Sequence, residues 1–283
     1  MTGVRRLRRR DMGYPRLLAA IHDPPPALFV RGAGSEEILS RSAVAVVGAR
    51  ACSAYGRSVA RSVARELAAA GLVVVSGMAR GIDGEAHRGA LEAGVTVAVL
   101  GCGVDRDYPA AHAELARRIC EQGLIVSEYE PGVEPAPWRF PARNRIIAGL
   151  CEATVVVEAR ERSGALITAD FALEEGRDVL AAPGEITSSL SAGTNALIRL
   201  GATPVTCAGD ILELFDLEPA KPDGASLDPA AQALLERLRD GAMTADELVR
   251  ASGVDPAAAS AALVELELGR RVVLEDGVFR ASI

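Results

Sequence analysis

Residues 43–77 read AVAVVGARACSAYGRSVARSVARELAAAGLVVVSG and contain one strand–helix–strand unit. Two short runs rich in valine, at 43–47 and 72–75, flank a stretch at 56–70 with apolar residues at helical spacing. Short β-branched runs predict buried strands, and the helical spacing predicts an α-helix that connects them. The segment therefore indicates a parallel α/β sheet.

The same alternation continues along the chain for about 170 residues. Further strands are predicted at 95–100, 124–126, 154–157 and 178–182, and further helices at 84–93, 110–122, 143–150, 165–176 and 194–200. This repetition predicts a doubly wound, mostly parallel sheet. Ligands of such sheets bind at the carboxyl ends of the strands, so the turns after the strands are the expected site.

We expect four segments along the chain. These are an irregular N-terminal lead-in at 1–40, the α/β domain at 41–216, a linker at 217–227 and a second domain at 228–283. The lead-in carries the basic stretch RRLRRR at 5–10, expected to be a disordered arm or simply the start of the described chain. The stretch DLEPAKPDGASL at 216–227, which contains the linker, is rich in Pro, Asp and Gly.

The second domain has the pattern of a winged helix. A first helix is predicted at 229–239, and a second begins at the capping box of Thr244 and Glu247. A third begins at Asp255-Pro256, and Asp276-Gly277 predicts a terminal hairpin. Residues 225–283 hold six arginines and ten acids, a net charge of −4, and the third helix lacks basic residues. A DNA-reading helix needs such residues, so we expect this domain not to bind DNA tightly.

Composition limits the classes of protein that remain. The 283 residues include no apolar run of about 20 residues, the length that spans a membrane, and the charged start is no signal peptide. Five scattered cysteines predict neither disulfides nor a metal site, and they favour the cytoplasm. The net charge of −7 argues against a nucleic-acid binder unless the basic residues are concentrated in one region.

The turn after the first strand, GARACSAYG at 48–56, lacks the glycines of a dinucleotide site. Arg50 and Ser53 stand where the second and third glycines of that motif would be, and no acid follows the second strand. Both features argue against NAD, and no cofactor is expected. A side-chain cation at the sheet edge suits phosphate instead, although a solvated turn arginine is the alternative.

The segment SGMARGIDGEAH at 76–87 follows the second strand. Asp83 and His87 lie four residues apart, a spacing that allows a proton-transfer pair. We favour helix capping and turn formation, because no third catalytic group or metal motif accompanies them. Tyr108, in the loop GCGVDRDYP at 101–109, is suited to stack on a base but is expected to pack instead.

The segment WRFPARNRII at 138–147 carries three arginines and two aromatic residues without an acid. Cations that follow a phosphate backbone and rings that stack on bases are what single-strand binding requires. A helix that begins near Arg143 would also direct its positive end at the site. The alternative is a charged helix start with Phe140 in the core.

Small polar turns follow the remaining strands. Ser163-Gly164 precedes a helix whose free amides suit a phosphate, with Thr168 one turn later. The segments APGEI at 182–186 and SAGTNALIRLGA at 191–202 add further turns of this kind. Together they predict an anion-binding rim rather than a catalytic pocket.

These motifs, in this order, resemble the DprA/Smf family (DNA-processing protein A). The resemblance runs from Tyr14-Pro15 to the C-terminus and rests most firmly on FPARNRIIAGL at 140–150, SGALITA at 163–169 and GTNALIRLGA at 193–202. It implies an extended Rossmann fold, a homodimer, and a protein without enzymatic activity that protects single-stranded DNA and loads the RecA recombinase in natural transformation. Many members begin with a helical domain, and we do not expect the residues before Tyr14 to supply it.

The motif positions also imply the DNA-binding residues. These are Arg50, Ser53, Phe140, Arg143, Asn144, Arg145, Ser163, Gly164 and Thr168, with Gly184, Gly193 and Asn195 on the same rim. Replacing both Arg143 and Arg145 by Glu is expected to abolish binding in a folded protein.

Two other functions remain as hypotheses. One is a nucleoside-monophosphate hydrolase of the lysine-decarboxylase-like Rossmann type, whose PGGxGTxxE motif this sequence lacks. The other is a sequence-specific transcription factor, which the acidic third helix of the winged-helix domain disfavours.

Overall fold

A computed structural model describes residues 3–220, 227–269, 271–275 and 277–281. The chain forms two units, Met1–Ala220 and Lys221–Ile283. The larger unit holds the predicted α/β domain together with the N-terminal lead-in. Residues 221–226 of the predicted linker lie outside the described residues.

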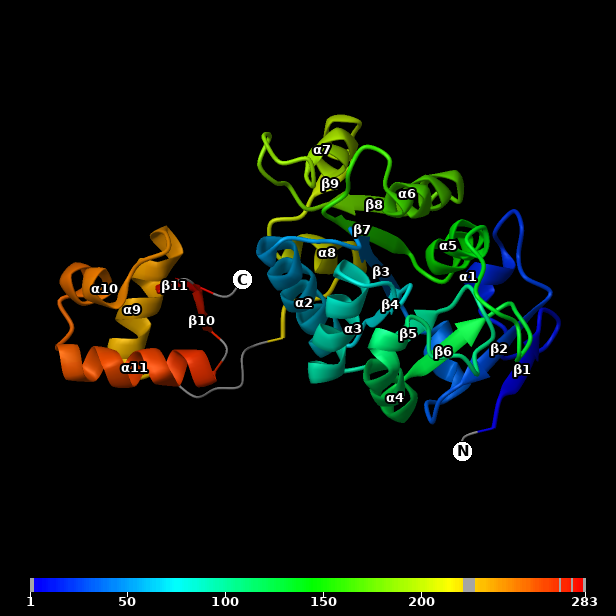
Figure 1. Cartoon of the computed structure of the whole chain (residues 1–283), viewed down its shortest axis with the longest axis horizontal. Helices are drawn as coiled ribbons and strands as arrows, with labels where there is room; N and C mark the ends of the chain where they lie inside the picture. Colours follow the sequence, from blue (N-terminus) through cyan, green and yellow to red (C-terminus); the bar gives the residue numbers. More distant parts are fainter. Residues whose placement is uncertain (1–2, 221–226, 270, 276, 282–283) are drawn as a thin grey trace. The chain divides into compact units, whose positions relative to one another are not determined.

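A nine-stranded sheet runs through the larger unit in the order β1-β2-β6-β5-β4-β3-β7-β8-β9 (Figure 1). Its strands are β1 Arg5–Arg8, β2 Ala27–Arg31, β3 Ala43–Gly48, β4 Val73–Ser76, β5 Thr96–Val99, β6 Leu124–Ser127, β7 Ala153–Val157, β8 Asp178–Ala181 and β9 Thr203–Pro204. All pairings from β6 to β9 are parallel, whereas β2 pairs antiparallel with β6 and β1 with β2. The predicted mostly parallel, doubly wound sheet is confirmed.

Helices cover both faces of this sheet. Residues of α1 Arg16–Ala19, α5 Arg139–Gly149, α6 Gly164–Glu174 and α7 Ala192–Arg199 join the core on one face. Residues of α2 Ala54–Ala69, α3 Ile82–Ala93, α4 Ala113–Gln122 and α8 Gly209–Leu212 join the cores on the other. The sequence of β3 is continuously apolar because both of its faces are buried. Val44 and Val46 pack on the second face, and Ala45 and Val47 pack on the first.

Regular structure begins earlier than the sequence predicted. The expected irregular lead-in at 1–40 contains β1, β2, α1 and the short 3₁₀ helix η1 Glu36–Ser40. The RRLRRR stretch is therefore not a disordered arm, because Arg5–Arg8 pairs with β2 at the edge of the sheet. Prolines before Ala27 hid β2, whose residues from Ala27 to Val30 are all buried.

Helix α5 also begins earlier, at Arg139 rather than near Arg143. Pro141 lies in its first turn, where the missing N–H has no partner within the helix in any case. Two further 3₁₀ helices, η2 Ala110–His112 and η3 Glu213–Phe215, precede α4 and follow α8.

The smaller unit has the predicted winged-helix pattern. Its helices are α9 Pro229–Asp240, α10 Ala245–Ser252 and α11 Pro256–Leu268, and its hairpin pairs β10 Val272–Glu275 with β11 Val278–Ala281. The capping box of Thr244 and Glu247 is formed, and Asp255 caps α11. Leu234, Leu248 and Leu266, one from each helix, pack in its core. Asp276 of the predicted turn lies outside the described residues.

Candidate nucleic-acid interface

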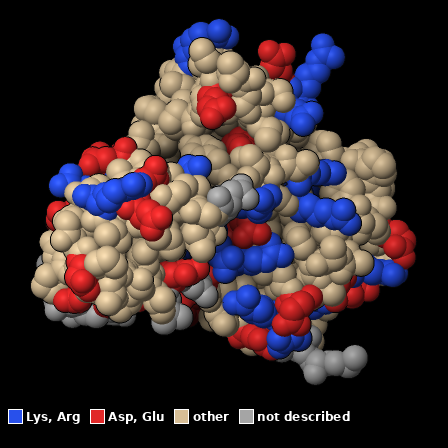
Figure 2. All heavy atoms as spheres, turned by 60° about the vertical axis from the view of Figure 1, so that its left-hand side comes forward, with Lys and Arg blue, Asp and Glu red and all other residues tan. Residues whose placement is uncertain are grey.

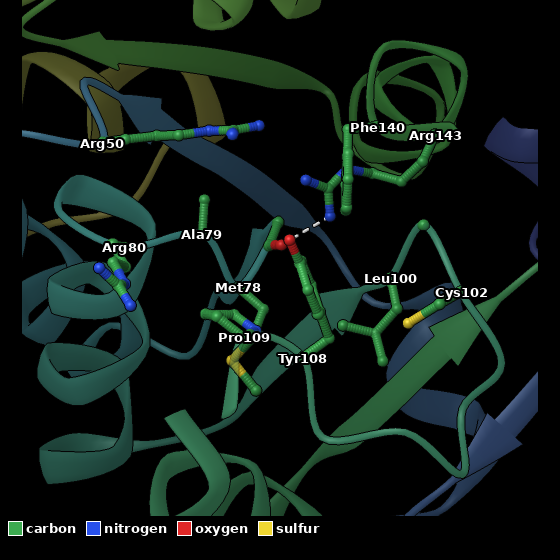
Figure 3. A pocket seen from close by; sticks show the side chains of 12 residues that line it. Arg50, Met78, Ala79, Arg80, Leu100, Cys102, Tyr108, Pro109, Phe140 and Arg143 are labelled. Carbon is green, nitrogen blue, oxygen red and sulfur yellow. Dashed lines mark hydrogen bonds between the residues drawn. The ribbon is translucent and has the colours of Figure 1, made fainter. Parts of the chain in front are cut away.

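Two neighbouring pockets open at the carboxyl ends of the parallel strands. The first has a volume of about 180 Å³ and lies beside the turns that follow β4 and β5 (Figure 3). The second, of about 230 Å³, lies beside the turns that follow β3 and β7. Both pockets are lined by Arg50, Ala79, Phe140 and Arg143. This is the edge at which a doubly wound sheet binds its ligands.

Close backbone packing joins the turns that follow β3 and β4, beside these pockets. The amide of Ile82, at the start of α3, donates to the carbonyl of Ala49 with an N–O distance of 3.2 Å. Gly81 lies against that turn with φ of +77°, and a Cβ there would collide with the carbonyls of Ala49 and Arg50. Glycine is therefore required at this position, which brings the turns after β3 and β4 together.

Phe140 lies at the boundary between the two pockets. Its ring stacks on Tyr108 with centroids 5.3 Å apart and an interplanar angle of 22°. The guanidinium carbon of Arg50 lies 5.7 Å from the centroid of the same ring. Tyr108 is 42% exposed and Phe140 half-buried, so both rings border the first pocket in reach of a planar ligand. Tyr108 thus packs on Phe140, as expected, and also keeps an accessible surface.

Arg143 is buried and holds two strand ends together. Its guanidinium donates to the carbonyl of Gly77 at 2.6 Å (Figure 3). It also donates to the carbonyl of Val99. Burial lowers its pKa to about 10, and the nearby Asp83 carboxylate opposes that shift. Because Arg143 anchors the backbone, replacing it by Glu is a test of folding as much as of binding.

The charge of Arg145 is compensated by two carboxylates. Its Nη2 lies 2.7 Å from Glu128 Oε2, and its Nε lies 2.9 Å from Asp23 Oδ2. Arg145 lines neither pocket. The structure therefore gives this predicted DNA-binding residue the geometry of an ion pair that fixes α5 to its neighbours.

The second pocket brings four further predicted residues together. Asn144, Ser163, Gly164 and Thr168 all line it. The Asn144 side chain donates to the Gly164 carbonyl at 3.0 Å, which ties α5 to the start of α6. Ser163 caps α6, and the first amides of a helix attract anions. This wall of the pocket therefore has the geometry of a phosphate site.

Ser53 donates its hydrogen bonds to a buried carboxylate, which the sequence did not predict. Glu158, after β7, accepts a hydrogen bond from the Ser53 amide at 2.9 Å and another from its hydroxyl. Glu158 is 4% exposed and has a positive φ of 53°. Its backbone geometry gave no sequence signal, because positive φ is expected mainly of glycine and asparagine.

The last three predicted residues serve a neighbouring turn. The Asn195 side chain forms a reciprocal pair with the backbone of Gly184, accepting from its amide at 3.2 Å and donating to its carbonyl at 3.0 Å. A Cβ at Gly193 would lie 2.7 Å from the Ala159 carbonyl. Gly184, Gly193 and Asn195 line neither pocket, and they shape the turns beside it.

Two exposed arginines supply the uncompensated charge of the site. Arg50 and Arg80 line the first pocket, and among the described residues neither forms an ion pair. Arg80, like the pocket residues Met78 and Cys102, was not predicted. Its signal was present in the GMARG turn after β4. On the face of the larger unit that Figure 2 shows, both basic and acidic side chains reach the surface.

Asp83 and His87 do not form a catalytic pair. The Asp83 carboxylate accepts from the amide of Ala79 at 3.2 Å, and burial raises its pKa although Arg143 opposes this. The His87 ring is fully buried, and its Nδ1 lies 2.7 Å from the hydroxyl of Thr96. Burial lowers the pKa of His87 to about 3. The preference for turn formation over proton transfer agrees with this geometry.

Comparison with known proteins decides the family. Residues 5–216 match the family described as DNA recombination-mediator protein A, and residues 218–277 match the DprA winged helix domain. The chain belongs to the DprA family. The DNA processing protein DprA of Streptococcus pneumoniae is 48% identical over 73% of this chain and 72% of its own length. Protein Smf of Escherichia coli is 42% identical over 93% of this chain and 74% of its own length.

Solved structures of DprA proteins share the fold. The X-ray structure of DprA from Streptococcus pneumoniae superimposes with a TM-score of 0.71 and 45% identity, over 77% of this chain and 75% of that one. A Helicobacter pylori DprA structure, described as showing a unique single-stranded DNA binding mode, has a TM-score of 0.69 and 29% identity. That alignment covers 77% of this chain and all of the other. The resemblance inferred from the motifs is confirmed.

Within 3–220, 227–269, 271–275 and 277–281, no group of three or more His, Cys, Asp and Glu side chains is placed to hold a metal ion. In the same ranges, every helix is too short or too polar to cross a bilayer.

Proposed function

We propose that this DprA protein binds single-stranded DNA in the two strand-end pockets. One observation carries the proposal: Phe140, stacked on Tyr108, lies beneath the guanidinium of Arg50 at the boundary of both pockets. Aromatic rings and a cation at one concave edge suit unpaired bases and their phosphates. The Helicobacter pylori relative with the same fold, described as binding single-stranded DNA, supports the assignment.

The two pockets suit different parts of a nucleotide. The first is lined largely by apolar side chains, including Met78, Leu100 and Tyr108, and accommodates a base. The second combines Arg50 with the capped start of α6 at Ser163 and Gly164, and accommodates a phosphate. The proposed DNA-binding residues are therefore Arg50, Arg80, Tyr108, Phe140, Asn144, Ser163, Gly164 and Thr168, with Arg143 beneath them. Ser53, Arg145, Gly184, Gly193 and Asn195 support the surrounding turns.

The cellular role that follows is protection of incoming single strands and loading of the RecA recombinase in natural transformation. A homodimer in the cytoplasm is part of this proposal. Leu200, at the end of α7, is 82% exposed, and Ile186 is 96% exposed, so the region after β8 offers apolar surface for a second copy. The proposal assigns no catalytic reaction to the protein and requires no cofactor.

The test is a binding titration with fluorescent oligo-dT and with a duplex of the same length, repeated over a range of salt. Single strands are expected to bind more tightly than duplex, because a paired base cannot enter the first pocket. The affinity is expected to fall as salt rises, since phosphate contacts release counterions. Equal affinity for duplex, or no binding of single strands, would contradict the proposal.

A further inference from the structure

A second cluster of aromatic rings and arginine lies one strand further along the same sheet edge. It consists of Tyr129, which follows β6, and Trp138 and Arg139 at the start of α5. The guanidinium carbon of Arg139 lies 4.9 Å from the centroid of the Tyr129 ring and 4.8 Å from that of the Trp138 ring. The two rings meet edge to face with centroids 6.4 Å apart. Neither pocket includes these three residues.

Trp138 is exposed far more than a large aromatic side chain ordinarily is. Its residue surface is 63% accessible, although it belongs to the most hydrophobic side chains and neighbours a well-packed helix. The guanidinium of Arg139 lies over the Trp138 ring and donates to the carbonyl of Glu134. Within the described residues Arg139 makes no ion pair, and its Nε is buried without a hydrogen-bond partner. The cluster thus offers a fixed ring and a cation that no carboxylate neutralises.

The order of the strands places this cluster next to the proposed site. Strand β6 pairs in parallel with β5, so their carboxyl ends lie side by side, about 4.8 Å apart. The start of α5 lies against the end of β5, since a Cβ at Gly101 would be 3.0 Å from the Phe140 ring and 3.2 Å from the Arg139 carbonyl. A strand that leaves the first pocket toward β6 therefore meets Trp138 next.

We propose that Tyr129, Trp138 and Arg139 form a second stacking platform for an unpaired base of the same DNA strand. This rests on the proposed function and extends it. The ring of Trp138 stacks on a base outside the pockets, and Arg139 lies near the adjoining phosphate. The platform fixes the direction in which the strand runs along the sheet edge, from the ends of β3 and β4 toward the end of β6.

The chain offers a direct probe, because Trp138 is its only tryptophan. A base stacked on indole is expected to quench its fluorescence. Unlabelled oligo-dT of about 16 nucleotides, the upper end of a single-strand site size, is therefore titrated into the full chain while emission is followed. A parallel titration follows the anisotropy of the same oligonucleotide carrying a fluorophore. We expect quenching that saturates at the concentration at which anisotropy saturates.

Two variants complete the experiment. Trp138→Ala is expected to weaken binding of the longer oligonucleotide about 5- to 150-fold, with an unchanged salt dependence because no charge is removed. A strand of about 4 nucleotides, which fills the pockets alone, is expected to bind Trp138→Ala and the wild type equally. Trp138→Phe keeps a stacking ring of smaller size and is expected to retain most of the affinity.

The outcomes separate this inference from the proposed function. Binding seen by anisotropy without quenching, or unchanged affinity of Trp138→Ala for the longer strand, overturns the second platform and leaves the pockets as the site. Absence of binding in the anisotropy titration overturns both proposals together.

Discussion

Two regions of this chain have folds that proteins use to bind nucleic acids, and their surfaces differ in chemistry. The strand ends of the large sheet present Arg50 and Arg80, which form no ion pair within the described part of the chain, next to exposed aromatic rings. Helix α11 of the winged-helix unit presents Val264, Glu265 and Glu267 to solvent and has no basic residue. Function depends on the side chains that a fold presents rather than on the fold itself. We infer that single-stranded DNA binds the sheet and not the winged helix.

The largest effect is expected at the buried arginine beneath the pockets. Arg143→Ala removes the guanidinium donor from the carbonyls of Gly77 and Val99 and removes the cation with the larger effect of the two that stabilise the buried Asp83 carboxylate. We expect the free energy of unfolding to fall by about 3–5 kcal/mol. Urea unfolding followed by the fluorescence of Trp138 reports this change, because Trp138 lies in the large unit.

The exposed Arg16 of α1, in the same unit, provides the control for this prediction. Arg16→Ala is expected to change stability by less than about 0.5 kcal/mol. An Arg143→Ala protein of full stability that no longer binds oligo-dT would show that Arg143 contacts DNA directly instead of holding the strand ends.

The second-largest effect is expected from charge reversal, which should weaken DNA binding in the large sheet but not in the winged-helix unit. Arg50→Glu with Arg80→Glu is expected to weaken binding of oligo-dT at least about 100-fold, because two free cations become anions at the pockets. Arg237→Glu with Arg239→Glu makes the same change of charge on exposed positions of α9. This matched variant is expected to bind like the wild type in an anisotropy titration at one salt concentration. Equal losses in both variants would mean that only net charge matters.

Acid should destabilise the large unit and leave the winged helix less affected. All three histidines lie in the large unit, and burial lowers the pKa of His87 to about 3 from an ordinary 6.5. The unfolded chain therefore binds a proton that the folded protein excludes, so stability falls as the pH falls. From pH 7 to pH 5 we expect a loss of about 2 kcal/mol.

Urea unfolding at the two pH values, again followed by Trp138 fluorescence, measures this loss. His87→Gln removes the titrating group and should flatten the dependence. A variant that loses stability to the same extent as the wild type would assign the effect to other groups.

The smallest effect is expected at the stacking ring. Phe140→Leu keeps an apolar side chain against Tyr108 but removes the aromatic face. We expect a loss of about 1 kcal/mol in binding free energy for oligo-dT, the lower end of the range for a stacked base. The slope of affinity against salt should not change, since no charge is lost. A changed slope would mean that the substitution displaces Arg50.

Much of the fold could be predicted from the sequence, because the central strands are continuous valine-rich runs. The runs at 43–47 and 154–157 correspond closely to β3 and β7. Strand β1 could not be predicted, because three of its four residues are arginines and only Leu7 is buried. It forms a strand because it pairs with β2, and this pairing depends on the folded sheet rather than on the local sequence.

The site was predictable in composition but not in detail. The pattern FPARNR correctly drew attention to α5, and the structure places Phe140, Arg143 and Asn144 at the pockets. The partners of Arg145 are 17 and 122 residues away in the sequence, so its neutralisation had no local signal. Arg80 and Tyr108 gain their place from turns after two other strands, which only the folded sheet brings beside Phe140.

Photocrosslinking of oligo-dT to the full chain, with mass spectrometry of the adducts, tests the central claim most directly. We predict adducts on Tyr108 or Phe140 in the strand-end pockets. Adducts confined to residues 229–281 of the winged-helix unit would contradict the account.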